Sequence, residues 1–389
     1  MACAIGGCGA PVADAVDRSA PATAFDGGPV SEADAGPIPA ADGGPADAGV
    51  FLAADVVRKE TGFDLLAVDR AGTAYAVSTD GSDTDLWASA DGQSWVRRGP
   101  PSGASFRVMT ALEDSTLLAD VVDQSGHAIA RSTDHGANWK KVLSTGVYRA
   151  LTPHSFGELG GVAYFLEYQV FTVASTPIRL WASTDGGASW TVRYTFQGHR
   201  HGHGLAIDGV RNALWAFFGD SDAQSGAYRS TDGGATWKAV VAGDQDGDIV
   251  DAIVLPDGSL FCGQDISYVP PHPAIARIHL DGSIDHLFTL PSASYSTHAI
   301  TGGGYVVGAT YELTNDVSPP GWTSGSLWGS GDGLHWEKLL EVAQLDPHDD
   351  VRTDVYWELS SGELVVSVRN AAGFGPGGVG YLLLRTTRR

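Results

Sequence analysis

"RSTDGGATW", residues 229–237, combines one acidic residue, two adjacent glycines and a closing tryptophan, and it recurs along the chain. Near copies read "ASTDGGASW" at 182–190 and "RSTDHGANW" at 131–139, and the shorter forms "ASADGQSW" and "GSGDGLHW" occupy 88–95 and 329–336. The aspartates of the five copies are 43, 51, 47 and 100 residues apart, so the last gap spans two periods. A repeat of this length indicates an array of similar supersecondary units.

Each period has the pattern of short β-strands separated by polar turns. The unit around the quoted stretch reads "GLAID", "ALWAFFGD", "GAYRSTDGG" and "TWKAVV", with the repeated turn between the third and fourth segments. Four strands per unit are typical of the blade of a β-propeller. We count seven units and therefore predict an all-β fold with seven four-stranded blades, or six if one unit is misdivided.

The two ends of the propeller region complement each other. The last unit ends at "GYLLLRTTRR", after three strands, while "VFLAADVVRK" at 50–59 precedes the first unit without a partner. Pairing these segments would complete the last blade and remove an open sheet edge. We therefore expect an N-terminal strand to close the ring and the propeller to span residues 50–389.

The N-terminal segment has a different composition. Residues 9–49 are rich in Ala, Asp, Gly and Pro, which predicts a disordered acidic tether. Within residues 1–8, the run Ile5-Gly6-Gly7-Cys8 resembles a bacterial lipobox, whose cysteine is lipidated after signal cleavage. The hydrophobic segment that should precede it is missing, so a truncated signal remnant and a chance match are the alternatives. We expect a cell-surface or extracellular protein that contacts a membrane only through such a lipid anchor.

Charge excludes one class of partner. The formal net charge is −22, and phosphate binding needs a basic face, so we expect no nucleic-acid partner. No apolar run reaches the roughly 18 to 20 residues of a membrane helix. We expect a monomer that has no cofactor and takes a polysaccharide or glycan ligand.

The repeated turn resembles the Asp-box, or BNR repeat, whose pattern is Ser-x-Asp-x-Gly-x-Thr/Ser-Trp. Multiple copies at blade spacing make the chain similar to the sialidase-like superfamily of propellers. The aspartate can accept hydrogen bonds from backbone amides of its own turn, and the tryptophan can pack on the blade. In that family the turns lie on the outer periphery, so the resemblance implies that these aspartates are scaffold and that function lies elsewhere.

Functional residues are expected in the loops before the first strand and between the second and third strands of each blade. The richest is "QGHRHGHG" at 197–204, where an extended backbone would point His199, His201 and His203 to one side, and Gly202 and Gly204 would leave room for a ligand. We predict catalytic roles for His201, His203, Tyr311 and Glu312, and substrate binding by Arg149, Tyr168, Asp220, Gln264, His298, Arg352 and Arg369.

The resemblance implies a carbohydrate-active protein that acts on or recognises an acidic glycan. Sialidases hold a carboxylated sugar with three arginines and use a tyrosine nucleophile activated by a glutamate, together with an acidic aspartate. Their Phe/Tyr-Arg-Ile-Pro motif is absent here, and the nearest stretch, "SFRVM" at 105–109, lacks the proline. This departure puts sialidase activity in doubt.

Two further functions fit the same residues. In a uronate polysaccharide lyase, His201 or His203 would be the base, Tyr311 the acid, and Arg149 or Arg352 the neutraliser of the uronate carboxylate. A non-catalytic propeller that binds a glycan or a protein is the alternative from another class. We expect no metal, although a His-x-His segment can supply two nitrogens to zinc.

Overall fold

The computed structural model describes residues 49–80, 85–99, 103–170, 177–266, 272–313 and 322–389. The lipobox-like segment 1–8 and all but the last residue of the predicted tether 9–49 lie outside the described residues. Within the described ranges, no helix is long and apolar enough to cross a membrane.

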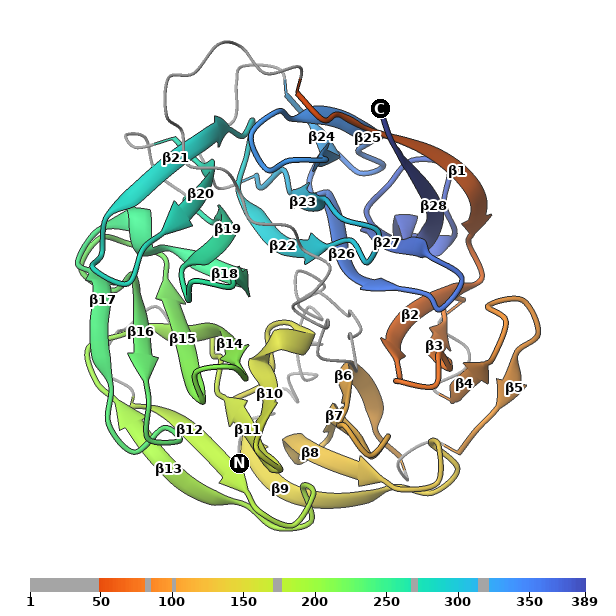
Figure 1. Ribbon diagram of the computed structural model, residues 1–389. Helices are drawn as coiled ribbons and strands as arrows, with labels where there is room; N and C mark the ends of the chain where they lie inside the picture. The colour runs from red at the N-terminus through yellow and green to blue at the C-terminus, as the bar shows by residue number, and fades with distance from the viewer. Residues whose placement is uncertain (1–48, 81–84, 100–102, 171–176, 267–271, 314–321) are drawn as a thin grey trace, which may run out of the picture.

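Seven antiparallel sheets of four strands form a closed ring (Figure 1). From the inner to the outer strand, blade 1 has β2 (Phe63–Val68), β3 (Ala74–Ser78), β4 (Leu86–Ser89) and β5 (Val96–Arg97), and blade 2 has β6 (Ser105–Ala111), β7 (Leu117–Asp123), β8 (Gly126–Ser132) and β9 (Lys140–Gly146). Blade 3 has β10 (Phe156–Leu159), β11 (Val162–Leu166), β12 (Ile178–Ser183) and β13 (Thr191–Phe196), and blade 4 has β14 (His201–Asp208), β15 (Ala213–Gly219), β16 (Gly226–Ser230) and β17 (Lys238–Ala242).

The remaining blades follow the same order. Blade 5 has β18 (Ile249–Val254), β19 (Leu260–Gln264), β20 (Ala274–Ile278) and β21 (Ile284–Thr289), and blade 6 has β22 (Ser294–Ala299), β23 (Tyr305–Ala309), β24 (Ser324–Ser330) and β25 (Glu337–Ala343). Blade 7 has β26 (Arg352–Glu358), β27 (Glu363–Arg369), β28 (Gly380–Arg388) and β1 (Leu52–Glu60). Among the described connections, three form short 3₁₀ helices: η1 (Pro153–Ser155), η2 (Gln245–Gly247) and η3 (Pro376–Gly378). The prediction of seven blades is confirmed.

The N-terminal strand closes the ring, as predicted. β1 pairs antiparallel with β28, from Leu52 opposite Arg388 to Glu60 opposite Tyr381. Figure 1 shows β1 as the outermost strand of the blade that carries the chain's C-terminus. Both edges of the last sheet are thus supplied by distant parts of the chain, and β28 is not left as an unpaired edge.

The repeated turns connect the third and fourth strands of five blades, at the outside of the ring (Figure 1). In blade 4, Asp232 Oδ1 accepts the backbone amide of Thr236 at 2.9 Å, and its Oδ2 accepts the Thr236 hydroxyl at 2.6 Å. The indole of Trp237 donates to the carbonyl of Gly234 at 3.1 Å. Gly234 has a φ of 79°, a conformation that favours glycine. The turn is therefore held by its own side chains, as the sequence predicted.

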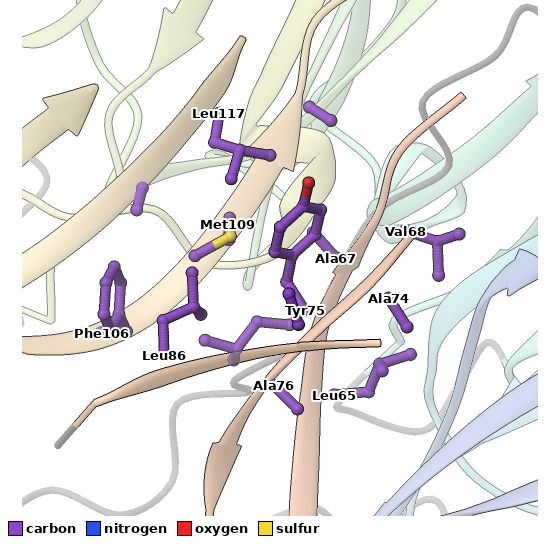
Figure 2. Packing of buried hydrophobic residues seen from close by; sticks show 14 of the residues in the cluster. Leu65, Ala67, Val68, Ala74, Tyr75, Ala76, Leu86, Phe106, Met109 and Leu117 are labelled. Carbon is purple, nitrogen blue, oxygen red and sulfur yellow. The ribbon is translucent and has the colours of Figure 1, made fainter. Parts of the chain in front are cut away.

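The hydrophobic core lies between neighbouring blades. Figure 2 shows Tyr75 and Leu86 of blade 1 packed beside Met109 and Leu117 of blade 2, and all four are fully buried. The Tyr75 hydroxyl donates to Asp69 at 2.9 Å, so its polar atom is satisfied. Complete burial of such side chains contributes about 1.5–3 kcal/mol each, so the blades stabilise one another face to face.

One end of the ring gathers most of the positions for which the sequence predicts a function. In each blade the first strand lies nearest the axis and its neighbour runs antiparallel, so the start of the first strand lies beside the end of the second (Figure 1). In blade 4, His201 lies opposite Gly219, and in blade 7, Arg352 lies opposite Arg369. We call this end, where the first strands begin, the start face.

The turn aspartates predict how stability depends on pH. Hydrogen bonds from Asn138 hold the pKa of Asp134 at about 2, and hydrogen bonds likewise lower the pKa values of Asp185 and Asp232. A lowered pKa in the folded state adds stability that is complete above about pH 4 and is lost as the pH falls through the folded value. Asp232→Asn should therefore lower the melting temperature at pH 7 and flatten its decline between pH 5 and pH 2. The exposed Asp222→Asn is the control, and identical slopes for the two variants would contradict the assignment.

Ring closure predicts an abrupt effect of truncation. Removing residues 1–48 leaves β1 in place, so the melting temperature should equal that of the full chain. Removing residues 1–60 deletes β1 and exposes the edge of β28, so it should lower the melting temperature and promote aggregation. Thermal unfolding and light scattering of both truncations test this, and equal stability of the two would show that β1 does not close the ring.

Candidate functional site

A cluster of charged and aromatic side chains lies at the start face. Its members come from five consecutive blades and lie at the start of a first strand, at the end of a second strand, or in the adjoining segments. The antiparallel pairing within each blade places these positions side by side. In blade order, the members are Arg149 and Tyr168, then His201, His203 and Asp220, then Asp248 and Asp265, then Tyr295 and Glu312, and finally Arg352.

Two histidines converge on one carboxylate in blade 4. Asp220 Oδ1 lies 2.9 Å from His201 Nε2 and 3.4 Å from His203 Nε2. The two imidazole rings are 4.9 Å apart. Both histidines are buried, whereas the Asp220 side chain is 24% exposed and also pairs with Arg200. The carboxylate of Asp220 is therefore the part of this group that solvent can reach.

The histidines and Asp220 differ in their protonation. Burial would raise the pKa of Asp220, but hydrogen bonds from His201 and His203 outweigh it and hold that pKa far below its usual range. Burial lowers the pKa of His201 more than Asp220 raises it. For His203, contacts with Asp220 and Asp248 overcome burial and raise the pKa well above its usual value. The surroundings of His203 and Asp220 therefore favour a negative carboxylate beside a positive charge.

Two buried carboxyl groups from blade 5 flank His203. Asp248 Oδ1 lies 3.3 Å and Asp265 Oδ2 3.9 Å from His203 Nδ1. Burial raises the pKa of both aspartates, and for Asp265 the charges of Asp248 and Glu312 raise it further. Burial and the neighbouring charges therefore favour the neutral form of Asp265.

A tyrosine–glutamate pair from blade 6 interacts electrostatically with Asp265. The hydroxyl of Tyr295 donates a hydrogen bond to the carboxylate of Glu312. The guanidinium of Arg352 lies over the Tyr295 ring, 4.2 Å from its centre. Burial raises the pKa of Tyr295 well above its usual value, and the charges of Asp265 and Glu312 raise it further. The Tyr295 phenol therefore holds its proton more firmly than an ordinary tyrosine does.

A small hydrophobic cluster connects residues of blades 3, 5 and 6 within the site. Leu151, Val250 and Tyr295 pack together, and Tyr168 packs against them. The Tyr168 ring also stacks on His201, with ring centres 4.3 Å apart, and the Arg149 guanidinium lies 5.1 Å from its centre. Each tyrosine of the site is thus backed by an arginine.

Two predicted site residues lie next to the cluster but make other contacts. The Gln264 side chain donates to the Asp246 carbonyl at 3.0 Å and accepts the Ala274 amide at 3.1 Å, so it holds the blade 5 loops. Tyr311 pairs through its backbone with Val351, and its ring packs against the hydrophobic cluster of blades 6 and 7.

Two others lie farther away. Arg369 is at the start face, but it donates to Asp64 of blade 1 at 2.7 Å. His298 lies at the opposite end of β22, where its Nε2 is 3.9 Å from Glu358.

His199 does not join the other two histidines, so the prediction that all three share a side is wrong. Its ring stacks on Phe218 with centres 4.1 Å apart, and its Nδ1 lies 2.7 Å from the Gln224 carbonyl. The reason is that β14 begins only at His201. The alternation of side chains therefore covers His201 and His203 and does not extend back to His199.

The glycines between the histidines also have a different role from the one predicted. The Gly202 amide donates to the Glu167 carbonyl at 3.1 Å, and a β-carbon there would collide with Leu166. A β-carbon on Gly204 would collide with the Val250 carbonyl. These glycines let neighbouring blades approach each other, and they do not open space for a ligand.

The sequence predicts no catalytic or binding role for Tyr295, Asp248 or Asp265, although Tyr295 and Asp265 lie in the loops expected to face the mouth of the propeller. A signal existed for the aspartates, because Asp248 directly precedes β18 and Asp265 directly follows β19. Asp220 likewise directly follows β15 in blade 4. Comparing equivalent positions in successive blades would have found them.

Two sets of side chains have donor atoms placed to hold a metal ion. One consists of His201, His203 and Asp220, and the other of His203, Asp248 and Asp265, with the donor atoms of each set within 4.8 Å of one another. The first set includes two imidazoles and the partly exposed carboxylate. The second is buried on all sides.

No family model matches the chain, and no curated protein matches its sequence. Among solved structures, the GH74 enzyme of Niastella koreensis is similar with a TM-score of 0.51 and 13% identity, over 84% of this chain and 59% of that chain. The GH74 xyloglucanase from Xanthomonas campestris is similar with a TM-score of 0.50 and 14% identity, over 83% of this chain and 54% of that one.

YCF48 from Cyanidioschyzon merolae is similar with a TM-score of 0.49 and 15% identity, over 85% of this chain and 98% of that one. The chain spans somewhat more than half the length of the two GH74 enzymes. At these identities the likeness shows the fold alone, that of a β-propeller.

The packing around Gly219 predicts a local effect on stability. A β-carbon at Gly219 would collide with the buried side chains of His203 and Asp248. Gly219→Ala should therefore lower the free energy of unfolding by about 1–3 kcal/mol, as overpacking does. Gly209→Ala is the matched control, because its β-carbon would meet no atom within 4 Å. Urea denaturation measures both, and equal stabilities would contradict the described packing.

Proposed function

We propose that the protein is a glycoside hydrolase that acts on an acidic glycan at the start face. The observation that carries this proposal is the Tyr295–Glu312 hydrogen bond beneath the guanidinium of Arg352. A phenol that donates to a carboxylate can lose its proton as it attacks, and a cation over the ring stabilises the phenolate that forms. The Asp-box resemblance of the turns supports the same choice, since sialidase-like enzymes use a tyrosine nucleophile.

The proposed chemistry has two steps, and each step needs a proton donor and a proton acceptor. The Tyr295 oxygen attacks the anomeric carbon while Glu312 takes the phenolic proton. The bond to the leaving glycosidic oxygen breaks, and the protonated Asp265 supplies a proton to that oxygen. Water then attacks the anomeric carbon, Asp265 recovers its proton from that water, and Glu312 returns the proton to the departing tyrosine oxygen. Each group ends the cycle as it began.

Arg352 supports an acidic substrate. It is 5% exposed, and its Nη1 has no hydrogen-bond partner among the residues that the structure describes. A buried guanidinium nitrogen without a partner is costly, and a substrate carboxylate would satisfy it with a charge-assisted hydrogen bond. Arg149, behind Tyr168, is the second cation of the site.

The uronate lyase fits less well, because Tyr311, its proposed acid, is partly buried against the hydrophobic cluster of blades 6 and 7. A non-catalytic glycan-binding propeller would use the same surface and is distinguished by the experiment below. The cell-surface or extracellular location that we propose rests on residues 1–49 of the sequence.

Substitution of the tyrosine–glutamate pair tests the hydrolase. A panel of acidic and neutral glycans identifies a substrate by release of reducing ends. On that substrate, Tyr295→Phe and Glu312→Gln should each lower kcat by at least about 100-fold, the usual contribution of such groups. Tyr194→Phe, on the outer strand β13, is the matched control and should keep full activity.

Covalent trapping gives a second readout. A fluorinated activated glycoside of the same sugar, which forms the glycosyl-enzyme faster than it is hydrolysed, should label Tyr295 in peptide mass spectrometry. Full turnover by Tyr295→Phe, or labelling of another residue, would overturn the assignment. Glycan binding that is lost in Arg352→Lys without cleavage by the parent protein would show the binding propeller instead.

A further inference from the structure

Two imidazole nitrogens and one carboxylate oxygen converge in blade 4. His201 Nε2 and His203 Nε2 both approach the same oxygen of Asp220, at 2.9 and 3.4 Å. The Tyr295–Glu312 mechanism makes no use of these groups. The two imidazoles are 2% exposed, so their surroundings and not bulk water decide their orientation.

The opposite nitrogen of each imidazole also faces an acceptor. His201 Nδ1 lies 2.8 Å from the Gln169 carbonyl, and His203 Nδ1 lies 3.2 Å from the Ile249 carbonyl. These carbonyls can only accept, so each Nδ1 carries a hydrogen. A neutral histidine then has its lone pair on Nε2, and both lone pairs point at the Asp220 carboxylate.

Such an arrangement requires positive charge at its centre. Two lone pairs and a carboxylate oxygen repel one another unless extra protons or a cation lie between them. Metal-binding histidines characteristically donate their other ring N–H to a backbone carbonyl or a carboxylate, which fixes the tautomer. Both histidines do so here, and the Asp248 carboxylate lies 3.3 Å from His203 Nδ1 as well.

We propose that His201 Nε2, His203 Nε2 and Asp220 Oδ1 bind a divalent transition-metal ion, zinc by preference. Bonds of about 2.0–2.2 Å at tetrahedral or right angles separate neighbouring donor atoms by about 2.9–3.5 Å. The two distances to Asp220 Oδ1 match those separations. Imidazole donors suit zinc, iron, copper and nickel, whereas magnesium and calcium prefer oxygen ligands.

The surroundings of Asp220 fit a metal ligand. Its Oδ2 pairs with Arg200, which leaves Oδ1 directed at the two histidines. Because the side chain is 24% exposed, this side of the site can admit an ion and a fourth ligand such as water. The set of His203, Asp248 and Asp265 has one imidazole and no exposed member, so we assign the ion to the first set.

Metal analysis of the full chain tests this proposal. Protein without an affinity tag is incubated with Zn²⁺, passed through gel filtration and analysed by plasma mass spectrometry. We expect one zinc ion per chain. His203→Gln and Asp220→Asn should weaken Zn²⁺ binding by more than the roughly 10- to 100-fold that loss of an outer partner of a ligand costs. His127→Gln, which removes a histidine beside the buried Asp120, is the control and should retain the ion.

A spectroscopic measurement on the parent protein covers the case in which a variant fails to fold. Cobalt(II) in place of zinc should give visible absorption bands of a four- or five-coordinate nitrogen–oxygen site. Parent protein that retains no zinc and shows no such bands would overturn the proposal, as would His203→Gln with full zinc content. Tyr295→Phe should keep its zinc whatever its activity, so the metal site and the hydrolase can fail separately.

Discussion

The pairing of β1 with β28 is the constraint on which the rest of the structure depends. A row of seven blades has two free sheet edges, and each edge exposes unpaired backbone groups. β1 joins the two ends of the chain in one sheet and so closes the ring. In a closed ring, the distances between the seven first strands depend on how all the blades pack together. Those distances decide which side chains meet at the start face.

Close approach of the first strands explains the composition near the site. The positions of Gly202, Gly204 and Gly219 have no room for a β-carbon, because backbone or side chains of neighbouring blades fill that space. The same closeness buries His203, Asp248 and Asp265 together, although burial of single charges is expensive. The imidazole of His203 lies near both carboxyl groups, and its attraction to them offsets part of that cost.

The site has two halves with different chemistry. Blades 6 and 7 supply a phenol, a carboxylate and a guanidinium, which suit nucleophilic attack on a sugar. Blade 4 supplies two imidazoles and a carboxylate, which suit an ion. The pKa of Asp265 responds to the charges of both His203 and Glu312, so Asp265 interacts electrostatically with both halves. An ion bound in blade 4 would therefore also influence the proton on Asp265, which gives the two halves a physical connection.

Much of the architecture follows from local pattern, because a blade is a local structure. The period of the turns predicts seven units, and the missing fourth strand of the last unit predicts closure by the N-terminal segment. Alternation also places His201 and His203 together. By contrast, the Tyr295–Glu312 pair, the burial of Asp248 and Asp265, and the separation of His199 from its neighbours depend on where strands begin and how closely blades pack. Those distances are set by closure of the ring across hundreds of residues, and no local pattern records them.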